Sequence, residues 1–320
     1  MAKITIRLRP FLKRVRSSVR NHDSLGFCMF ARMTLRDATF SLLQKLRTIY
    51  DEGEASSITE LVMETLTGST RTERMLYTHA ELTTGEETRL AAVTERLINH
   101  EPVQYVLNEA WFGGMRFYVD EQVLIPRPET EELVNWMIAE IRSRGKDSSP
   151  IKILDIGTGS GCIPVTLKVR VEDAEIWSCD KSEQAMDVAR RNAAAMDAGI
   201  SFRQLDFLDR EQWILLPTFD LIISNPPYIP ETERNTLAPN VRNYEPSMAL
   251  FVPDNDPLVF YRAIAEFGST HLALGGAMFM EIHEDRSLAT EELFRAAGFV
   301  TEIRKDMQGK QRMLKVLRSS

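Results

Sequence analysis

The chain has 320 residues, of which 43% are hydrophobic and 27% charged, and a formal net charge of −7. At roughly 150 residues a domain, this length predicts about two domains. The composition excludes collagen-like, coiled-coil and wholly disordered chains. Charged residues interrupt every apolar run before the roughly 18 residues that a bilayer span needs, so we expect no membrane-spanning segment. The three cysteines form no CxxC pair and the five histidines have no ligand-like spacing, so we expect no metal site, no disulfide framework and a cytoplasmic location.

The first 32 residues are strongly basic. Eight Lys or Arg residues stand against Asp23 alone, a charge of +7, which leaves −14 for residues 33–320. An organellar transit segment, a binding arm and sequence upstream of the natural start all remain open. We favour the last, because Met33 opens a conventional amphipathic helix, and we expect residues 1–32 to be weakly ordered. The acidic remainder would repel a phosphate backbone, so we expect no direct nucleic-acid binding.

Helical periodicity dominates the region that follows. It predicts helices over residues 34–50, 57–66, 72–78 and 85–99. We interpret residues 33–107 as a small helical bundle. It could be a substrate-docking domain or a packing lid, and composition gives no preference between the two. In residues 108–124, aromatic-rich runs on both sides of Gly113-Gly114 predict a β-hairpin linker.

Strands and helices alternate through residues 125–320, which predicts an α/β fold with a doubly wound, seven-stranded, mostly parallel sheet of Rossmann-like type. The expected strands are 151–156, 174–179, 200–205, 219–224, 276–282, 299–306 and 312–318. The expected helices are 128–144, 160–170, 182–197, 255–270 and 286–297. The last two strands are close enough in sequence to pair antiparallel.

A glycine-rich loop follows the first of these strands. Its candidate ligand-binding residues are Asp155, Gly157, Thr158, Gly159, Ser160 and Gly161. Glycines permit close backbone approach, and the next helix offers free N–H groups to a ligand. Cys162 stands where a dinucleotide fingerprint would place its third glycine, which weakens an NAD interpretation. A turn used only for packing remains the alternative.

Carboxylates end the next two strands. Asp180 lies about 20 residues beyond the glycine loop, where it could accept hydrogen bonds from ribose hydroxyls, although it could equally cap the following helix. Asp206 and Phe207 suit an adenine site, because a carboxylate can accept from the exocyclic amine and an aromatic ring can cover the base. Phe207 could instead be a core residue.

The strongest signal follows the apolar strand that ends at Ser224. There, Asn225-Pro226-Pro227-Tyr228 places a side-chain oxygen beside the carbonyl of Pro226, two converging acceptors that match one planar NH2 group. Tyr228 adds a flat face for stacking. We therefore interpret Asn225, Pro226, Pro227 and Tyr228 as the catalytic residues, and Asn225 also as a neighbour of the cofactor.

These motifs, in this order, resemble those of the class I S-adenosylmethionine-dependent methyltransferases that carry an NPPY motif. Further motifs make the chain similar to the peptide chain release factor N5-glutamine methyltransferases: they are Glu101-Pro102-Val103-Gln104-Tyr105, Leu124-Ile125-Pro126-Arg127-Pro128-Glu129-Thr130-Glu131 and Tyr244-Glu245-Pro246. The resemblance covers about residues 34–318. Asn108 stands where this family usually has glycine.

The resemblance implies S-adenosyl-L-methionine as cofactor, residues 125–320 as the catalytic domain, and release factors as protein partners of a monomeric enzyme. It places Thr130 and Arg127 beside the methionyl group of the cofactor. The implied reaction methylates the side-chain amide nitrogen of the glutamine in a Gly-Gly-Gln motif. Methylation of a glutamine in a ribosomal protein, adenine N6 methylation of DNA or RNA, and cofactor binding without catalysis remain alternatives.

Overall fold

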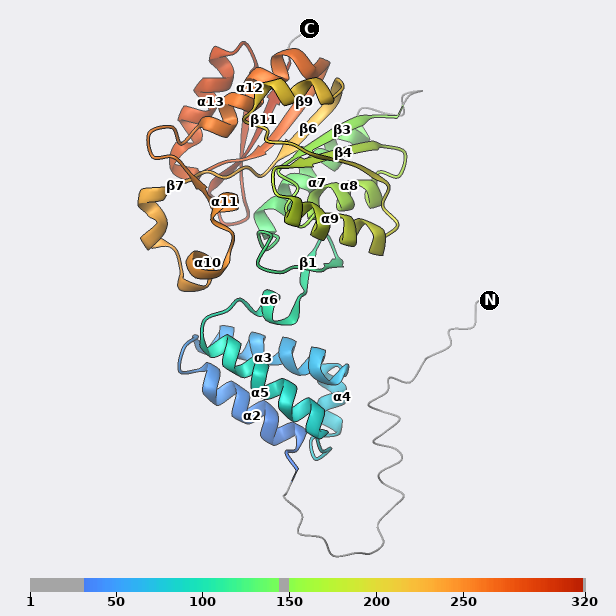
Figure 1. Ribbon diagram of the computed structural model, residues 1–320, viewed down its shortest axis with the longest axis vertical. Coiled ribbons are helices and arrows are strands. Elements are labelled where there is room, and N and C mark those ends of the chain that lie inside the picture. The colour runs from blue at the N-terminus through green and yellow to red at the C-terminus, as the bar shows by residue number, and fades with distance from the viewer. Residues whose placement is uncertain (1–31, 144–149, 319–320) are drawn as a thin grey trace, which may run out of the picture. The chain divides into compact units, whose positions relative to one another are not determined.

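The computed structural model describes residues 32–143 and 150–318. The chain divides into two compact units, residues 1–107 and 108–320 (Figure 1). We expect residues 1–32 to be weakly ordered. Except for Arg32, these residues lie outside the part of the chain that the structure describes. None of the helices in the described ranges has the length and apolarity that a membrane crossing requires.

The first unit is a bundle of helices. They are α2 (Leu35–Leu46), α3 (Glu52–Thr67), α4 (Arg71–Leu76), α5 (Thr84–Ile98) and the short α6 (Val103–Leu107). Each of the first four begins at a side chain that accepts a backbone N–H, namely Thr34, Asp51, Thr70 and Thr83. The prediction that the second helix begins at residue 57 is wrong, because the Asp51 cap starts it at Glu52. The bundle has its own apolar core around Leu42, Val62 and Leu97.

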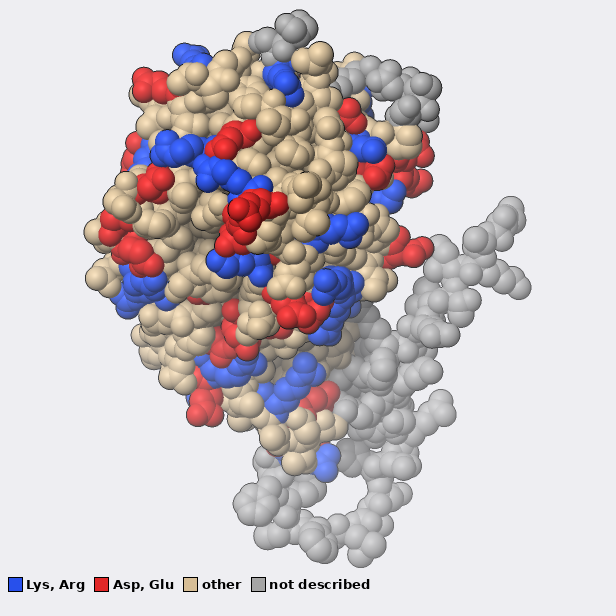
Figure 2. Space-filling view, turned by 45° about the horizontal axis from the view of Figure 1, so that its top comes forward, with Lys and Arg blue, Asp and Glu red and all other residues tan. Residues whose placement is uncertain are grey.

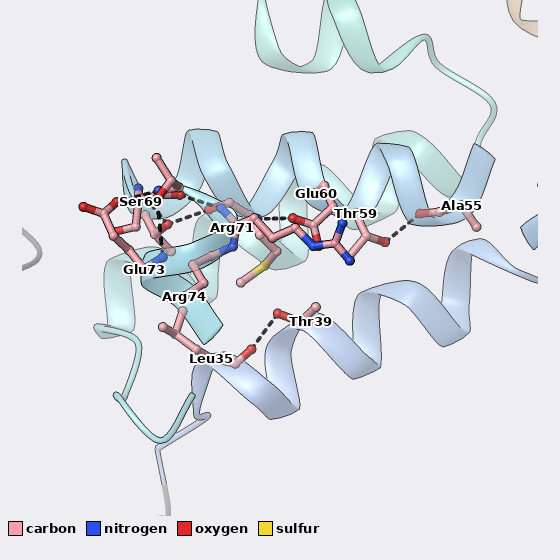
Figure 3. Close-up of polar contacts among 12 residues, drawn as sticks. Leu35, Thr39, Ala55, Thr59, Glu60, Ser69, Arg71, Glu73 and Arg74 are labelled. Atoms are coloured by element: carbon pink, nitrogen blue, oxygen red, sulfur yellow. Dashed lines mark hydrogen bonds and ion pairs between the residues drawn. The ribbon is translucent and has the colours of Figure 1, made fainter. Parts of the chain in front are cut away.

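An ion pair between a buried arginine and a partly exposed glutamate holds the turn between α3 and α4 (Figure 3). Gly68 ends α3 in the left-handed conformation, at φ 64°. The guanidinium group of Arg74, 7% exposed, then donates to the carbonyl of Ser69 and pairs with Glu60. Arg71 lies 3.8 Å from the same carboxylate. This cluster serves the packing of the bundle.

The second unit contains the seven-stranded sheet, in the order β10-β11-β9-β6-β3-β4-β5. Its strands are β3 (Lys152–Ile156), β4 (Glu175–Asp180), β5 (Ile200–Gln204), β6 (Phe219–Ser224), β9 (Leu272–Glu281), β10 (Val300–Lys305) and β11 (Gln311–Leu317). Among the described strands of this sheet, β11 alone runs in the direction opposite to the others. The predicted doubly wound, mostly parallel sheet is confirmed, as is the antiparallel pairing of the last two strands.

Helices cover both faces of this sheet (Figure 1). They are α7 (Pro128–Ser143), α8 (Cys162–Arg170), α9 (Glu183–Ala195), α12 (Val259–His271) and α13 (Ser287–Ala296). Alternate strand residues serve the two cores: Leu221 and Ile223 pack with α7 and α8, whereas Ile222 packs with α12 and α13. The chain runs outward from β3 to β5 and then returns to β6. The carboxyl ends of β3 and β6 therefore form the switch point at which such folds bind ligands.

The expected hairpin consists of β1 (Ala110–Phe112) and β2 (Met115–Phe117), paired antiparallel around Gly113 and Gly114. Asn108, just before it, has a φ of 53°, a left-handed conformation that asparagine tolerates better than most residues, which explains how it replaces a glycine there.

The segment 229–252 contains short elements that the sequence did not predict. They are β7 (Ile229–Pro230), η2 (Glu231–Thr236), α10 (Pro239–Tyr244), α11 (Ser247–Leu250) and β8 (Phe251–Val252). A short 3-10 helix, η1 (Arg210–Leu215), follows β5, and another, η3 (Glu284–Arg286), precedes α13. β7 and β8 pair in parallel and hold the segment together.

Candidate functional site

A cavity of about 340 Å³ lies at the carboxyl ends of β3, β4, β5 and β6. The segment after β7 contributes Pro246, Met248 and Phe251 to its wall. Most predicted site residues line this cavity; they are Thr130, Gly157, Thr158, Gly159, Ser160, Asp180, Asp206, Phe207, Asn225, Pro226 and Pro227. The structure thus brings together residues that lie up to 97 positions apart in sequence, between Thr130 and Pro227. Asp155, Gly161 and Tyr228 are not among the lining residues.

The glycines of the loop after β3 have different tasks. Gly157, Gly159 and Gly161 all have positive φ angles, which glycine adopts without strain. A Cβ atom at Gly159 would meet no atom within 4 Å, whereas one at Gly161 would lie 3.0 Å from the Cβ atom of Ala189 in α9. Gly161 therefore allows close packing against α9, whereas the absence of a side chain at Gly159 leaves space in the cavity.

Asp155 lies beneath the loop, with none of its surface exposed. One of its carboxylate oxygens, Oδ2, accepts hydrogen bonds from the hydroxyls of Ser178 at 2.6 Å and Thr158 at 3.1 Å. Burial raises its pKa to about 7, against the effect of these two hydrogen bonds. The expected direct contact with a cofactor thus receives no support from the geometry, because Asp155 supports the loop from below.

Asp180 ends β4 at the cavity wall. Its carboxylate accepts from the backbone N–H of Gly159 at 3.0 Å and of Ser182 at 2.9 Å. Burial raises the pKa of Asp180, and these backbone donors oppose the shift. Each oxygen accepts one of these bonds and keeps a lone pair for another donor. The capping alternative for Asp180 is wrong, because Ser182 caps α9: its hydroxyl accepts from the backbone N–H of Ala185 at 3.1 Å. The ribose interpretation of Asp180 stays a prediction.

Asp206 and Phe207 follow β5. The carboxylate of Asp206 lies 2.7 Å from the Lys181 ammonium group. Phe207 is 5% exposed, contacts Phe267 edge to face at a centroid distance of 5.2 Å, and lines the cavity. It is therefore both a core residue and a wall of the cavity, which joins the two interpretations of the sequence.

A chain of hydrogen bonds links the two ends of the NPPY motif. The side-chain Nδ2 of Asn225 donates to Thr130 Oγ1 at 3.0 Å, and that hydroxyl donates to Glu281 Oε2 at 2.6 Å. The Tyr228 hydroxyl donates to Glu281 Oε1 at 3.0 Å. Burial raises the pKa of Tyr228 well above its usual range. The hydroxyl of Tyr228 thus points to Glu281. Because Tyr228 is not among the residues that line the cavity, the stacking face expected of its ring receives no support from the geometry.

Arg127 and Glu245 form an ion pair at the cavity. A guanidinium nitrogen of Arg127 lies 2.7 Å from each carboxylate oxygen of Glu245, whose side chain is 1% exposed. Burial raises the pKa of Glu245, and Arg127 opposes the shift. The pair ties the segment after β7 to the start of α7.

Sequence reasoning missed Glu281 and the pairing of Glu245. Glu281 had a signal, because it is a carboxylate at the carboxyl end of an apolar strand, as Asp155 and Asp180 are. The Arg127–Glu245 pair spans 118 residues and had no local signal. No group of three or more His, Cys, Asp or Glu side chains is arranged to hold a metal ion in residues 32–143 and 150–318.

Comparison with known proteins identifies two families within the chain. The methyltransferase small domain matches residues 138–240, and the PrmC N-terminal domain matches residues 37–107.

Individual relatives extend the match to most of the chain. A release factor glutamine methyltransferase of Flavobacterium psychrophilum is 38% identical over 89% of this chain and 99% of its own length. One of Bacteroides thetaiotaomicron is 38% identical over 77% and 86%. A solved protein-(glutamine-N5) methyltransferase from Alicyclobacillus acidocaldarius is 26% identical, with a TM-score of 0.39, over 64% of this chain and 100% of its own. On the identity and coverage of the first two relatives, the chain belongs to the release factor glutamine methyltransferase family.

Proposed function

We propose that this protein transfers the methyl group of S-adenosyl-L-methionine to the side-chain amide nitrogen (N5) of the glutamine in the Gly-Gly-Gln motif of peptide chain release factors. The orientation of Asn225 is the observation that carries the proposal. Its Nδ2 is committed to Thr130, so its Oδ1 is the group that can accept a hydrogen bond from a substrate. A family whose curated members are named for the same reaction supports it.

The cavity residues fit the cofactor. Asp180 would hold the ribose hydroxyls, the loop with Gly157 and Gly159 would accommodate the amino-acid portion, and Asp206 with Phe207 would border the adenine. The open position at Gly159 and the available lone pairs of Asp180 are the structural features that support this fit. When bound, the cofactor supplies a methyl group on a positively charged sulfur, which is a strong electrophile.

The residues of the NPPY motif would orient the acceptor amide. Its nitrogen is a poor nucleophile, because the lone pair is delocalised into the carbonyl. Two acceptors, the Asn225 Oδ1 and the Pro226 carbonyl, would bind the two amide hydrogens and turn the nitrogen toward the methyl carbon. Transfer would form a nitrogen–carbon bond while the sulfur keeps the electron pair of the broken carbon–sulfur bond, and the methylated nitrogen would lose a proton to water. This sequence requires no dedicated base.

The helical unit is our candidate for the substrate-docking domain, and we expect the enzyme to act in the cytoplasm as a monomer. Cys162 and Cys179 are free buried thiols, in keeping with a reducing compartment. Acidic and basic side chains are interspersed on the face drawn in Figure 2. The net charge of −14 over residues 33–320 supports a protein substrate over a nucleic acid.

The test is mass spectrometry of a purified release factor incubated with the protein and S-adenosyl-L-methionine. We expect one added methyl group on the Gly-Gly-Gln glutamine. Asn225→Ala should reduce the rate by about 10²–10³-fold, the usual effect of losing one hydrogen bond to a transition state. A ribosomal protein and duplex DNA are incubated in parallel. Modification of either one alone, with an unmodified release factor, would overturn the proposed substrate.

A further inference from the structure

Glu281 lies at the end of β9, behind the NPPY motif, and is 2% exposed. Its two carboxylate oxygens have separate partners: Oε2 accepts from Thr130, and Oε1 accepts from Tyr228. Thr130 in turn contacts Asn225. The one buried carboxylate is therefore connected to both ends of the motif, directly to Tyr228 and through Thr130 to Asn225.

The hydrogen bonds to this group determine the direction of the others in the chain. Burial raises the pKa of Glu281, whereas the bonds from Thr130 and Tyr228 lower it. Both of its oxygens accept in the structure, so both hydroxyls that contact it donate. The Thr130 hydroxyl has a single proton, and once that proton points to Glu281 the oxygen can only accept from Asn225. Asn225 must then present its NH2 group to Thr130. Its oxygen is left for the cavity, which Asn225 lines.

We propose that Glu281 is a positioning residue that acts through Thr130 to hold the Asn225 side chain with its oxygen toward the substrate amide. The inference rests on the proposed function, and it gives the site its preference for an NH2 group. With the Asn225 amide reversed, an NH2 group would face the NH2 group of glutamine, and two donors would meet. A reversed Asn225 would instead suit a carboxylate, which accepts from donors.

This proposal also assigns Thr130 a role other than binding the carboxylate of the cofactor. The hydroxyl of Thr130 is 2.6 Å from one partner and 3.0 Å from the other, and the residue is 3% exposed. Its donor and one acceptor position are both in use within the protein. Its hydroxyl therefore relays the polarity of Glu281 to Asn225.

The experiment compares the binding of two release factors, one with Gly-Gly-Gln and one with Gly-Gly-Glu, to the full-length protein. The variants are Glu281→Gln, Thr130→Val, the double variant and Thr130→Ser. We expect the preference for glutamine over glutamate to fall by about tenfold in Thr130→Val, because the Asn225 amide loses its hydrogen-bond partner. The preference should also fall in Glu281→Gln, because glutamine offers one acceptor oxygen to two hydroxyls. The double variant should be no worse than Thr130→Val alone, because both act on one chain.

Thr130→Ser keeps the hydroxyl and should retain the wild-type preference. Thr290→Val is the matched control, because Thr290, in α13, is a fully buried threonine whose hydroxyl donates to the carbonyl of Arg286. It removes a buried hydroxyl and should leave the glutamine preference unchanged. An unchanged preference in Thr130→Val, or a double variant whose loss is the product of the single losses, would overturn the proposal.

A second measurement does not depend on the substrate. In NMR spectra of asparagine-labelled protein, the side-chain NH2 signal of Asn225 should shift and exchange faster in both Thr130→Val and Glu281→Gln, but not in Thr290→Val. An Asn225 signal that is unchanged in Glu281→Gln would contradict the proposal that Glu281 acts through Thr130. Failure of the wild-type protein to modify any release factor would instead reject the proposed function, and the NMR result would still decide the role of Glu281.

Discussion

At the scale of single residues, Asp155 carries the clearest pH dependence. Burial raises its pKa to about 7 in the folded protein, against an ordinary value of 3.8. A carboxyl group with a raised folded pKa favours folding while it is protonated. This contribution is fully present below about pH 4 and is lost as the pH rises to about 7, because the ionised form is buried.

We therefore predict that Asp155→Asn flattens the dependence of stability on pH between about 4 and 8. A shift of three pKa units corresponds to roughly 4 kcal/mol at most. Relative to the wild type, the variant's free energy of unfolding at pH 8 should therefore gain about 2–4 kcal/mol over its value at pH 4. Denaturant unfolding at several pH values measures it. Asp173→Asn is the control, because the side chain of Asp173 lies at an exposed turn. Parallel curves for Asp155→Asn and the wild type would contradict the prediction.

Two glycines of one loop give a second prediction at this scale. Gly161→Ala forces a Cβ atom to 3.0 Å from Ala189 at a φ of 78°, whereas Gly159→Ala meets only the backbone strain of a φ of 51°. We expect Gly161→Ala to cost about 2–4 kcal/mol of stability and Gly159→Ala about 1 kcal/mol. Gly159→Ala should weaken cofactor binding, but it should lower the melting temperature less than Gly161→Ala does. Thermal unfolding and calorimetric titration separate the two, and equal losses of stability would refute this division.

Most of the candidate site could be predicted because its residues follow strand ends. Asp180, Asp206 and Asn225 each stand at or just after the end of a strand, and parallel strands bring such positions to one edge. Asp155 has the same pattern and yet lies beneath the cavity. The sequence could place it at the strand end, but it could not show that Ser178 and Thr158 would enclose its carboxylate.

At the scale of elements, the predictions succeeded where hydrophobic periodicity extends over a whole strand or helix, as in β6 and α9. They failed in the segment 229–252, whose elements have two to six residues each. Such short elements have no periodicity to detect. They are held by long-range contacts, chiefly the pairing of β7 with β8 and the bond from Arg127 to Glu245.

We predict that Arg127→Gln loosens this segment. Glu245 would lose the positive partner of a side chain that is 1% exposed, and breaking a buried pair typically costs about 3–5 kcal/mol. Hydrogen exchange of α10, α11 and β8 should accelerate, and the affinity for cofactor should fall by about tenfold. The double variant Arg127→Gln/Glu245→Gln removes both charges and should recover part of the lost cofactor affinity and exchange protection.

The matched control is Arg262→Gln, since Arg262 pairs with Asp256 at an exposed position and such pairs contribute under about 1 kcal/mol. Arg262→Gln should leave exchange in the segment unchanged. Equal exchange rates in Arg127→Gln and the wild type would show that the segment does not depend on this ion pair.

At the scale of the whole molecule, the two units have separate apolar cores. The core of the first unit includes Leu42 and Val62, and those of the second unit lie on the two faces of its sheet. The cavity is lined by residues of the second unit alone, from Gln122 to Phe260. A ligand that binds only the folded second unit stabilises that unit by mass action.

We therefore predict two calorimetric unfolding transitions. S-adenosyl-L-methionine should raise the midpoint temperature of only one of them. At a concentration one hundred times its dissociation constant, the ligand should add about 2.7 kcal/mol to the stability of the second unit. Leu42→Ala removes a buried side chain from the first unit and should lower the other transition, at a cost of about 2–5 kcal/mol. If the ligand moves both transitions equally, or if Leu42→Ala lowers the ligand-sensitive one, the two units unfold as one and the division into independent cores is wrong.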